Sequence, residues 1–184
     1  MSVLAMDTST ANCTAAFDGR SASVEAPTGH AEHLADLIRQ VAPDFTQVSG
    51  IVVGVGPGPY TGLRVGVVTA VTMAEALSVP VSGVCSLDGL GRSAGDAVVV
   101  TDARRREVFA ARYVEGHRVE GPMVLPPSEV AQRWPEVAVL GPAVQRYPDL
   151  GALALLDAAA LLAVPAELPA RPWYLREPDA KPQK

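Results

Sequence analysis

The sequence predicts an α/β fold that opens as an antiparallel meander and continues with a strand, a loop, a helix and another strand. The Asp18-Gly19 pair separates two strand-like runs, Cys13 to Phe17 and Arg20 to Glu25, and this dipeptide is a strong hairpin signal. Further on, Ile51 to Val55 is a continuous β-branched run, which suits a strand buried on both faces. Val81 to Val84 has the same character. The long connection between these two buried strands indicates that they are parallel.

The elements that precede the buried strands follow from turn residues and apolar spacing. Val3 to Met6 is a short apolar run that ends in the polar turn Asp7-Thr8-Ser9-Thr10. The segment from Ala31 to Ala42 is predicted to be a helix that Pro43 ends. Its apolar residues at helical spacing are Leu34, Leu37, Ile38 and Val41.

A composition shift at Gly91 to Gly95 divides the chain into two predicted domains, residues 1–95 and 96–184. In the second domain, Ala97 to Thr101 and Val108 to Val114 flank a polar turn, as in a hairpin. We expect a reduced second meander there. Its remaining predicted elements are a helix at Pro127 to Arg133, a strand at Val137 to Leu140, a helix capped by Asp157, and a Pro-rich tail from Pro165 to Lys184.

Composition argues against independent binding to RNA. The chain has 184 residues, of which 48% are hydrophobic, and a formal net charge of −5. The three successive arginines Arg104-Arg105-Arg106 are its one tight basic cluster. Proteins that grip RNA alone usually present a wide basic surface. We therefore expect any nucleic-acid role to depend on a partner.

The cysteines and the apolar segments indicate a cytoplasmic protein with no membrane association. Cys13 and Cys85 lie far apart in apolar, strand-like contexts, which is typical of buried, reduced thiols. The start of the chain has no basic region of the kind that begins a signal peptide. The longest apolar stretch, Leu150 to Val164, is interrupted by Asp157 and is too short to span a bilayer.

The polar turn Asp7-Thr8-Ser9-Thr10 is the first candidate for a binding site. Hydroxyls and backbone N–H groups in such a turn can hold a phosphate, and an adjacent aspartate can hold a hydrated cation. The same residues are also common in ordinary turns. Taken alone, the motif favours the ordinary turn.

The glycine-rich segment Gly56 to Gly62 lies between a strand and a helix, as phosphate loops do. It lacks the lysine of a nucleoside triphosphatase loop. Pro57 and Pro59 interrupt the tight turn that a dinucleotide-binding fingerprint needs. We interpret the segment as a rigid turn in which Thr61 or its neighbour caps the following helix.

The helix after this turn is the most informative segment, because no charged residue occurs between Arg64 and Glu75. A helix that is apolar all round is covered on every side. Glycine and alanine at i+4 spacing let another backbone approach closely. We predict that one side faces the chain's own sheet and the other a second protein; the alternative is that both sides are covered internally. The predicted interface residues are Tyr60, Gly62, Leu63, Gly66, Val67, Ala70, Met73 and Ala74.

Nothing in the sequence assembles a catalytic or metal centre. His30 and His33 are three residues apart, but no suitable third ligand is near and catalytic zinc sites typically have three. His30 is therefore expected to be a solvated residue at the start of a helix. Ser86 does not lie in a Gly-x-Ser-x-Gly elbow. No catalytic or metal-binding residue is predicted.

Taken in order, these segments resemble the TsaB (YeaZ) family across nearly the whole chain. The most specific motif is Gly56-Pro57-Gly58-Pro59-Tyr60-Thr61-Gly62-Leu63-Arg64. The flanking motifs that fit are Leu4 to Thr10, His30 to Ile38, Pro80 to Leu87, Asp102 to Phe109, and Pro172 to Arg176.

The resemblance implies an actin/Hsp70-like (ASKHA, ribonuclease H-like) fold of two lobes, the second reduced. It also implies a heterodimer with the related subunit TsaD, which transfers threonylcarbamoyl to A37 of tRNA, and an assembly that the ATPase TsaE joins. In such a family the helix after the Gly-Pro-Gly turn forms a bundle with TsaD or with a second copy of the chain. ATP and Mg²⁺ are used by the complex, tRNA is reached through it, and this subunit alone is expected to bind no cofactor.

The resemblance further implies that this subunit is not an enzyme. TsaD carries His-Met-Glu-Gly-His where this chain has Ser86-Leu87-Asp88-Gly89-Leu90, so Ser86 and Leu90 replace both imidazoles and neither can bind a metal as histidine does. Asp7 to Thr10 are then a vestigial phosphate hairpin. The alternatives are a small ATPase or kinase of the same superfamily that uses Asp7 and Asp102, and a glycoprotease-like peptidase.

Overall fold

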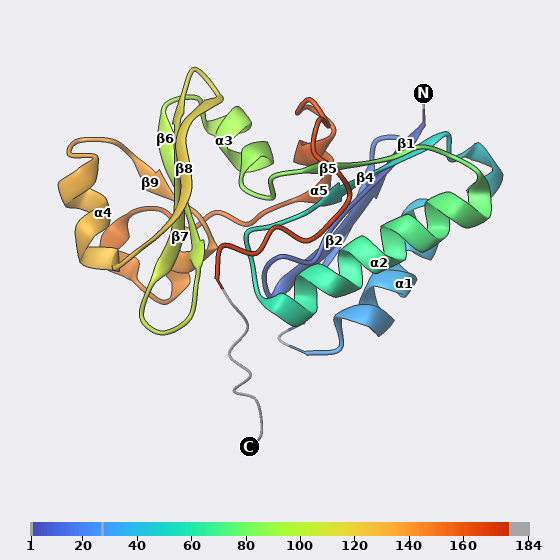
Figure 1. Cartoon of the computed structure of the whole chain (residues 1–184), viewed down its shortest axis with the longest axis horizontal. Helices are drawn as coiled ribbons and strands as arrows, with labels where there is room; N and C mark the ends of the chain where they lie inside the picture. The colour runs from blue at the N-terminus through green and yellow to red at the C-terminus, as the bar shows by residue number, and fades with distance from the viewer. Residues whose placement is uncertain (1, 27, 177–184) are drawn as a thin grey trace.

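The computed structural model describes residues 2–26 and 28–176 and has two lobes side by side, each built on one β-sheet (Figure 1). The lobes contain both helices and strands, and the first sheet mixes parallel with antiparallel pairs. The predicted α/β class is therefore confirmed. In the described part of the chain, no helix is both long and apolar enough to cross a bilayer.

The first sheet has the strand order β3-β2-β1-β4-β5. β1 pairs antiparallel with β2 and parallel with β4, and β4 pairs parallel with β5, which confirms the meander and the parallel unit. Asp18 and Gly19 form the turn between β2 and β3, both with positive φ. The strands are β1 (Val3–Asp7), β2 (Asn12–Phe17), β3 (Arg20–Glu25), β4 (Gly50–Gly54) and β5 (Val81–Val84).

Helices cover both faces of this sheet because its strands alternate apolar side chains between the faces. α1 (His30–Val41) and α2 (Tyr60–Leu77) lie on one face, over a core that includes Leu4 and Val53. The short α5 (Ala158–Leu161) lies on the other face, where Ala158 contacts Ala5 of β1. α1 buries the four apolar residues that its spacing predicted.

The second sheet has the order β8-β7-β6-β9 and a core of its own. The β6–β7 hairpin and α4 confirm the predictions, whereas β8 and α3, the helix between the lobes, were not predicted (Figure 1). The elements are α3 (Asp88–Ala94), β6 (Ala97–Asp102), β7 (Val108–Val114), β8 (His117–Leu125), α4 (Pro127–Arg133) and β9 (Val139–Leu140), with 3-10 turns at Phe45–Gln47, Pro142–Gln145 and Pro148–Leu150.

The end of the described chain returns to the first lobe. Leu161 packs with Val52 and Val84 of the first sheet, and Leu168 forms an antiparallel bridge with Gly83 on the free edge of β5. The Trp173 N–H donates a hydrogen bond of 2.8 Å to the Val55 carbonyl O. The second sheet begins at Ala97, and the segment after Leu156 packs on the first lobe. The division into residues 1–95 and a second lobe with a C-terminal tail at 96–184 stays a prediction. The end of the predicted tail, residues 177–184, lies outside the described residues.

Candidate functional site

The polar turn between β1 and β2 is docked against the start of α2 instead of lying open. Asp7, Thr8 and Ser9 are each only 1% exposed. The Thr8 hydroxyl donates to the Gly62 carbonyl O at 2.7 Å, and the Ser9 N–H donates to Asp7 Oδ1 at 2.7 Å. Thr10 is half-buried. Most of the turn's polar groups are therefore used within the chain.

Asp7 lies beneath this turn, with its carboxyl group against Gly54 and Ser86. Its Oδ2 is buried and accepts no hydrogen bond from the described residues. Burial raises the pKa of Asp7, and the Ser86 and Ser9 groups beside it only partly oppose that shift. The environment of Asp7 therefore favours the uncharged acid, which is a poor ligand for a cation.

A cavity of about 730 Å³ between the lobes borders Thr8, Ser9 and Thr10 but not Asp7. Asp102 and Arg104 line its opposite side. The Arg146 guanidinium donates to Asp102 Oδ2 at 3.3 Å. The two aspartates of the kinase alternative therefore do not face one another across a common site.

The glycine-rich loop makes room for the polar turn. A side chain at Gly58 would overlap the backbone of Ser9, and one at Gly62 would overlap the carbonyl O of Thr8. Pro59 is the N-cap residue of α2, with no side-chain cap bond, so the predicted cap by Thr61 or its neighbour is wrong. The glycines of the loop permit the close approach of a second backbone segment, and the rigidity of the turn stays a prediction.

The small-residue stripe of α2 is covered by the chain's own first lobe. Thr8 lies directly against Gly66, where a Cβ would overlap its hydroxyl. Met73 is partly buried against the same core, and Tyr60 stacks on Tyr174 with ring centroids 4.5 Å apart. The buried residues of the stripe contact the chain's own polar turn and sheet, so the expectation that these residues face a partner is not met. Partner contact by the half-buried Tyr60 and Met73 stays a prediction. The stripe residues buried in this way are Gly62, Leu63, Gly66, Val67, Ala70 and Ala74.

The opposite face of α2 is exposed and largely uncharged. Val68 and Val71 are 61% and 39% exposed, and Thr72 beside them is also exposed. Arg64 and Glu75 lie at the two ends of this face. The helix therefore has one apolar surface without a partner in the described chain, and it is not the surface that glycine spacing indicates.

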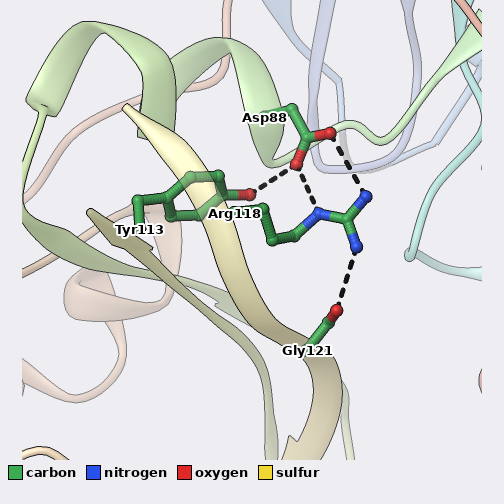
Figure 2. A network of polar contacts seen from close by, with 4 residues as sticks. All are labelled: Asp88, Tyr113, Arg118 and Gly121. Atoms are coloured by element: carbon green, nitrogen blue, oxygen red, sulfur yellow. Dashed lines mark hydrogen bonds and ion pairs between the residues drawn. The ribbon is translucent and has the colours of Figure 1, made fainter. Parts of the chain in front are cut away.

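A polar cluster that the sequence did not predict joins α3 to the second sheet (Figure 2). Asp88 Oδ1 accepts hydrogen bonds from the Tyr113 hydroxyl at 2.7 Å and from Arg118 Nε at 2.8 Å. Arg118 Nη1 donates to the Gly121 carbonyl O at 2.9 Å, and the guanidinium lies 5.6 Å from the centre of the Trp173 ring. The Asp88 carboxylate is occupied by these partners.

Burial raises the pKa of three weak acids in the two lobes. Burial raises the pKa of the Tyr113 hydroxyl, and the nearby Cys85 and Asp88 raise it further. Burial also raises the pKa of the Cys85 thiol, and burial together with Asp7 raises the pKa of Cys13 to about 11. Both thiols are buried, as predicted, and their pKa values keep them protonated at neutral pH.

The two histidines near α1 form no cluster with other ligand residues. His30 begins α1, and its Nε2 lies 2.9 Å from the Thr10 carbonyl O, so it is tied to the polar turn and not simply solvated. Among residues 2–26 and 28–176, no three His, Cys, Asp or Glu side chains gather closely enough to hold a metal ion. The Ser86 Oγ accepts a hydrogen bond from the Gly56 N–H at 3.1 Å.

Comparison with known proteins gives one consistent result. A family model described as "TsaD: tRNA N6-adenosine threonylcarbamoyltransferase" matches residues 22–140. The chain is 31% identical to the Escherichia coli tRNA threonylcarbamoyladenosine biosynthesis protein TsaB, over 88% of this chain and 81% of that protein. It is 42% identical to an uncharacterized Mycobacterium leprae protein over 98% of this chain, which spans 56% of that protein's length.

The fold agrees with these similarities. The structure of YeaZ from Pseudomonas aeruginosa superposes with a TM-score of 0.77 at 28% identity, covering 95% of this chain and all of that one. The two-lobe α/β architecture of this chain is therefore that of YeaZ.

Proposed function

The chain belongs to the TsaB (YeaZ) family of tRNA threonylcarbamoyladenosine biosynthesis, and we propose that it is the non-catalytic subunit that binds TsaD and activates it. In this proposal TsaD transfers threonylcarbamoyl to A37 of tRNA, the ATPase TsaE joins the assembly, and ATP and Mg²⁺ are used by the complex. The place of action is the cytoplasm, where tRNA is modified.

The residues at the candidate catalytic positions support an accessory role. Ser86 accepts a backbone hydrogen bond, and Asp88 is held by Tyr113 and Arg118. Leu90 offers no metal-binding atom in place of histidine. The polar side chains at two of these positions are thus engaged with other groups of the described chain.

The exposed face of α2 is the single observation that carries the proposed contact with TsaD. Isolated exposed valines are unremarkable on a protein surface, but Val68 and Val71 share one face of an 18-residue helix with no charged residue between Arg64 and Glu75. Helices of a bundle associate through such apolar faces. In the absence of TsaD, the same face is proposed to pair with a second copy of the chain.

Val68→Glu tests this proposal. A charge on the exposed face should reduce co-elution with TsaD at least tenfold in size-exclusion chromatography, because the interface would bury an unpaired carboxylate. Val119→Glu is the matched control, since Val119 is 59% exposed on β8 in the other lobe. Circular dichroism should show both variants folded.

Two results would contradict the proposal. Undiminished binding of the Val68→Glu variant to TsaD would exclude this face as the interface, and modification of tRNA by the purified chain alone would exclude the accessory role. Gly66→Leu is not a useful test of the interface, because a side chain there would overlap Thr8 and disturb the fold itself.

A further inference from the structure

Among the described residues, three hairpin connections have successive residues with positive φ, and one of them has an unusual sequence. Asp18-Gly19 connects β2 to β3, and Glu115-Gly116 connects β7 to β8. Both place glycine where the left-handed conformation is needed, as hairpin turns generally do. The turn between β6 and β7 instead has Arg104, Arg105 and Arg106, with φ of 59°, 50° and 61°.

Arginine is poorly suited to this backbone. A left-handed φ brings Cβ close to the following carbonyl oxygen in every residue except glycine. The turn is nevertheless closed by backbone hydrogen bonds, from the Glu107 N–H to the Arg104 carbonyl O and from the Ala103 N–H to the Glu107 carbonyl O, both 2.9 Å. Three arginines thus occupy positions where local conformational energy favours glycine or asparagine, which points to a role for their side chains.

The surroundings concentrate positive charge at this end of the second sheet. Arg104, Arg105 and Arg106 are all exposed. Asp102 fixes the turn by accepting from the Arg104 N–H at 3.0 Å, and it also pairs with Arg146. Glu107 pairs with Arg176. Asp102 and Glu107 each pair with an arginine from outside the turn. The five arginines named here thus gather around two carboxylates, on a chain whose net charge is −5.

We propose that the Arg104–Arg106 turn contacts backbone phosphates of RNA when the chain is assembled with TsaD. This inference rests on the proposed function. The planar guanidinium forms paired hydrogen bonds with phosphate oxygens, and a rigid turn presents several of them together. The contact is local, so it fits a chain that is too acidic to hold RNA without a partner.

The test compares the complex of TsaD with the wild-type chain and the complex with a turn variant, Arg104→Gln with Arg106→Gly. The probe is an unmodified tRNA transcript, titrated at several salt concentrations. Loss of two phosphate contacts should weaken binding about tenfold at 0.1 M salt and reduce the slope of log K against log salt by about 1.4. The melting temperature should stay level or rise by roughly 2–4 °C, because glycine relieves the left-handed backbone at position 106.

The control variant is Arg20→Gln with Arg92→Gln, which removes two exposed arginines elsewhere. Arg92 lies beside Gly116, at the opposite end of β7 from the arginine turn. This variant should keep the wild-type affinity and salt slope. Equal weakening by both variants would overturn the inference, since only overall charge would then matter.

The remaining outcomes are also decisive. Wild-type tRNA affinity in the turn variant overturns the inference and leaves the proposed function intact, provided that the complex assembles. Weakened binding of TsaD, TsaE or ATP at unchanged tRNA affinity assigns the turn to that ligand and also overturns it. If the wild-type chain does not assemble with TsaD, the proposed function fails. The wild-type chain and the turn variant are then each titrated alone with tRNA. Equal tRNA binding by the two chains overturns the inference as well.

Discussion

Asp7 and Asp88 are two largely enclosed carboxylates, one under the polar turn of the first lobe and one between the lobes. Asp88 is held by a tyrosine hydroxyl and a guanidinium, whereas one oxygen of Asp7 accepts no hydrogen bond from residues 2–26 and 28–176. Burying a carboxylate is costly unless an opposite charge or several hydrogen bonds compensate. Asp88 therefore stabilises the protein through its partners, whereas ionisation of the buried Asp7 carboxylate lowers the free energy of unfolding.

Asp88→Ala should have the largest effect. The change leaves the Arg118 guanidinium and the Tyr113 hydroxyl without their shared acceptor. The side chains of the ion pair are largely buried, with Arg118 26% and Asp88 16% exposed. We expect the free energy of unfolding to fall by about 2–3 kcal/mol, measured by urea denaturation.

A double variant sharpens this first prediction. Arg118→Met in the Asp88→Ala background also removes the unpaired charge. The double variant should therefore lose less free energy of unfolding than the sum of the losses in the two single variants. Simple additivity would mean that the ion pair contributes nothing as a unit.

Gly91→Ala should have the next largest effect. A Cβ at this position in α3 would overlap the Tyr113 ring and push the hydroxyl away from Asp88. Overpacking of this kind costs about 1–3 kcal/mol, again measured by urea denaturation. Ser93→Ala in the same helix is the control and should change stability by less; equal effects would show that the contact between Gly91 and Tyr113 does not matter.

Asp7→Asn should have the smallest effect and the opposite sign. The folded-state pKa of Asp7 lies above its ordinary value of 3.8, so its stabilising contribution is complete below that pH and is lost as the pH rises through the folded-state pKa. Asparagine is never charged. The variant should match the wild type near pH 3.8 and exceed it at pH 7 by up to about 1 kcal/mol, measured by urea unfolding at both pH values. If the Asp7→Asn variant instead became less stable than the wild type as the pH rises, the ionised Asp7 carboxylate would be compensated by its surroundings, contrary to this prediction.

Local signals in the sequence predicted much of the fold. The Asp18-Gly19 turn, the β-branched runs and the apolar spacing of α1 each depend on neighbouring residues, and the structure confirms all three. β8 was overlooked although Glu115-Gly116 carries a hairpin signal of the same kind. The return of the chain after Leu156 to the first lobe could not be predicted, because it depends on contacts between residues far apart in the sequence.

The candidate site was harder to predict for the same reason. A glycine at position 66 is equally compatible with a partner helix and with Thr8 of the same chain, since both need a close backbone approach. Asp88 meets Tyr113 and Arg118 across separations of 25 and 30 residues, and no local pattern connects them. Sequence spacing identified α2 as important but could not decide which of its two apolar faces the chain would cover itself.

The bridge between Leu168 and Gly83 has a consequence for the order of events during translation. β5 is the outermost strand of the first sheet, and an uncovered strand edge can pair with other chains. Residues near position 83 leave the ribosome well before those that shield them, so the nascent polypeptide carries an open β edge until synthesis passes Trp173. Ribosome-bound intermediates that stop short of this point are therefore the stage at which the protein is most exposed to aggregation and to chaperones.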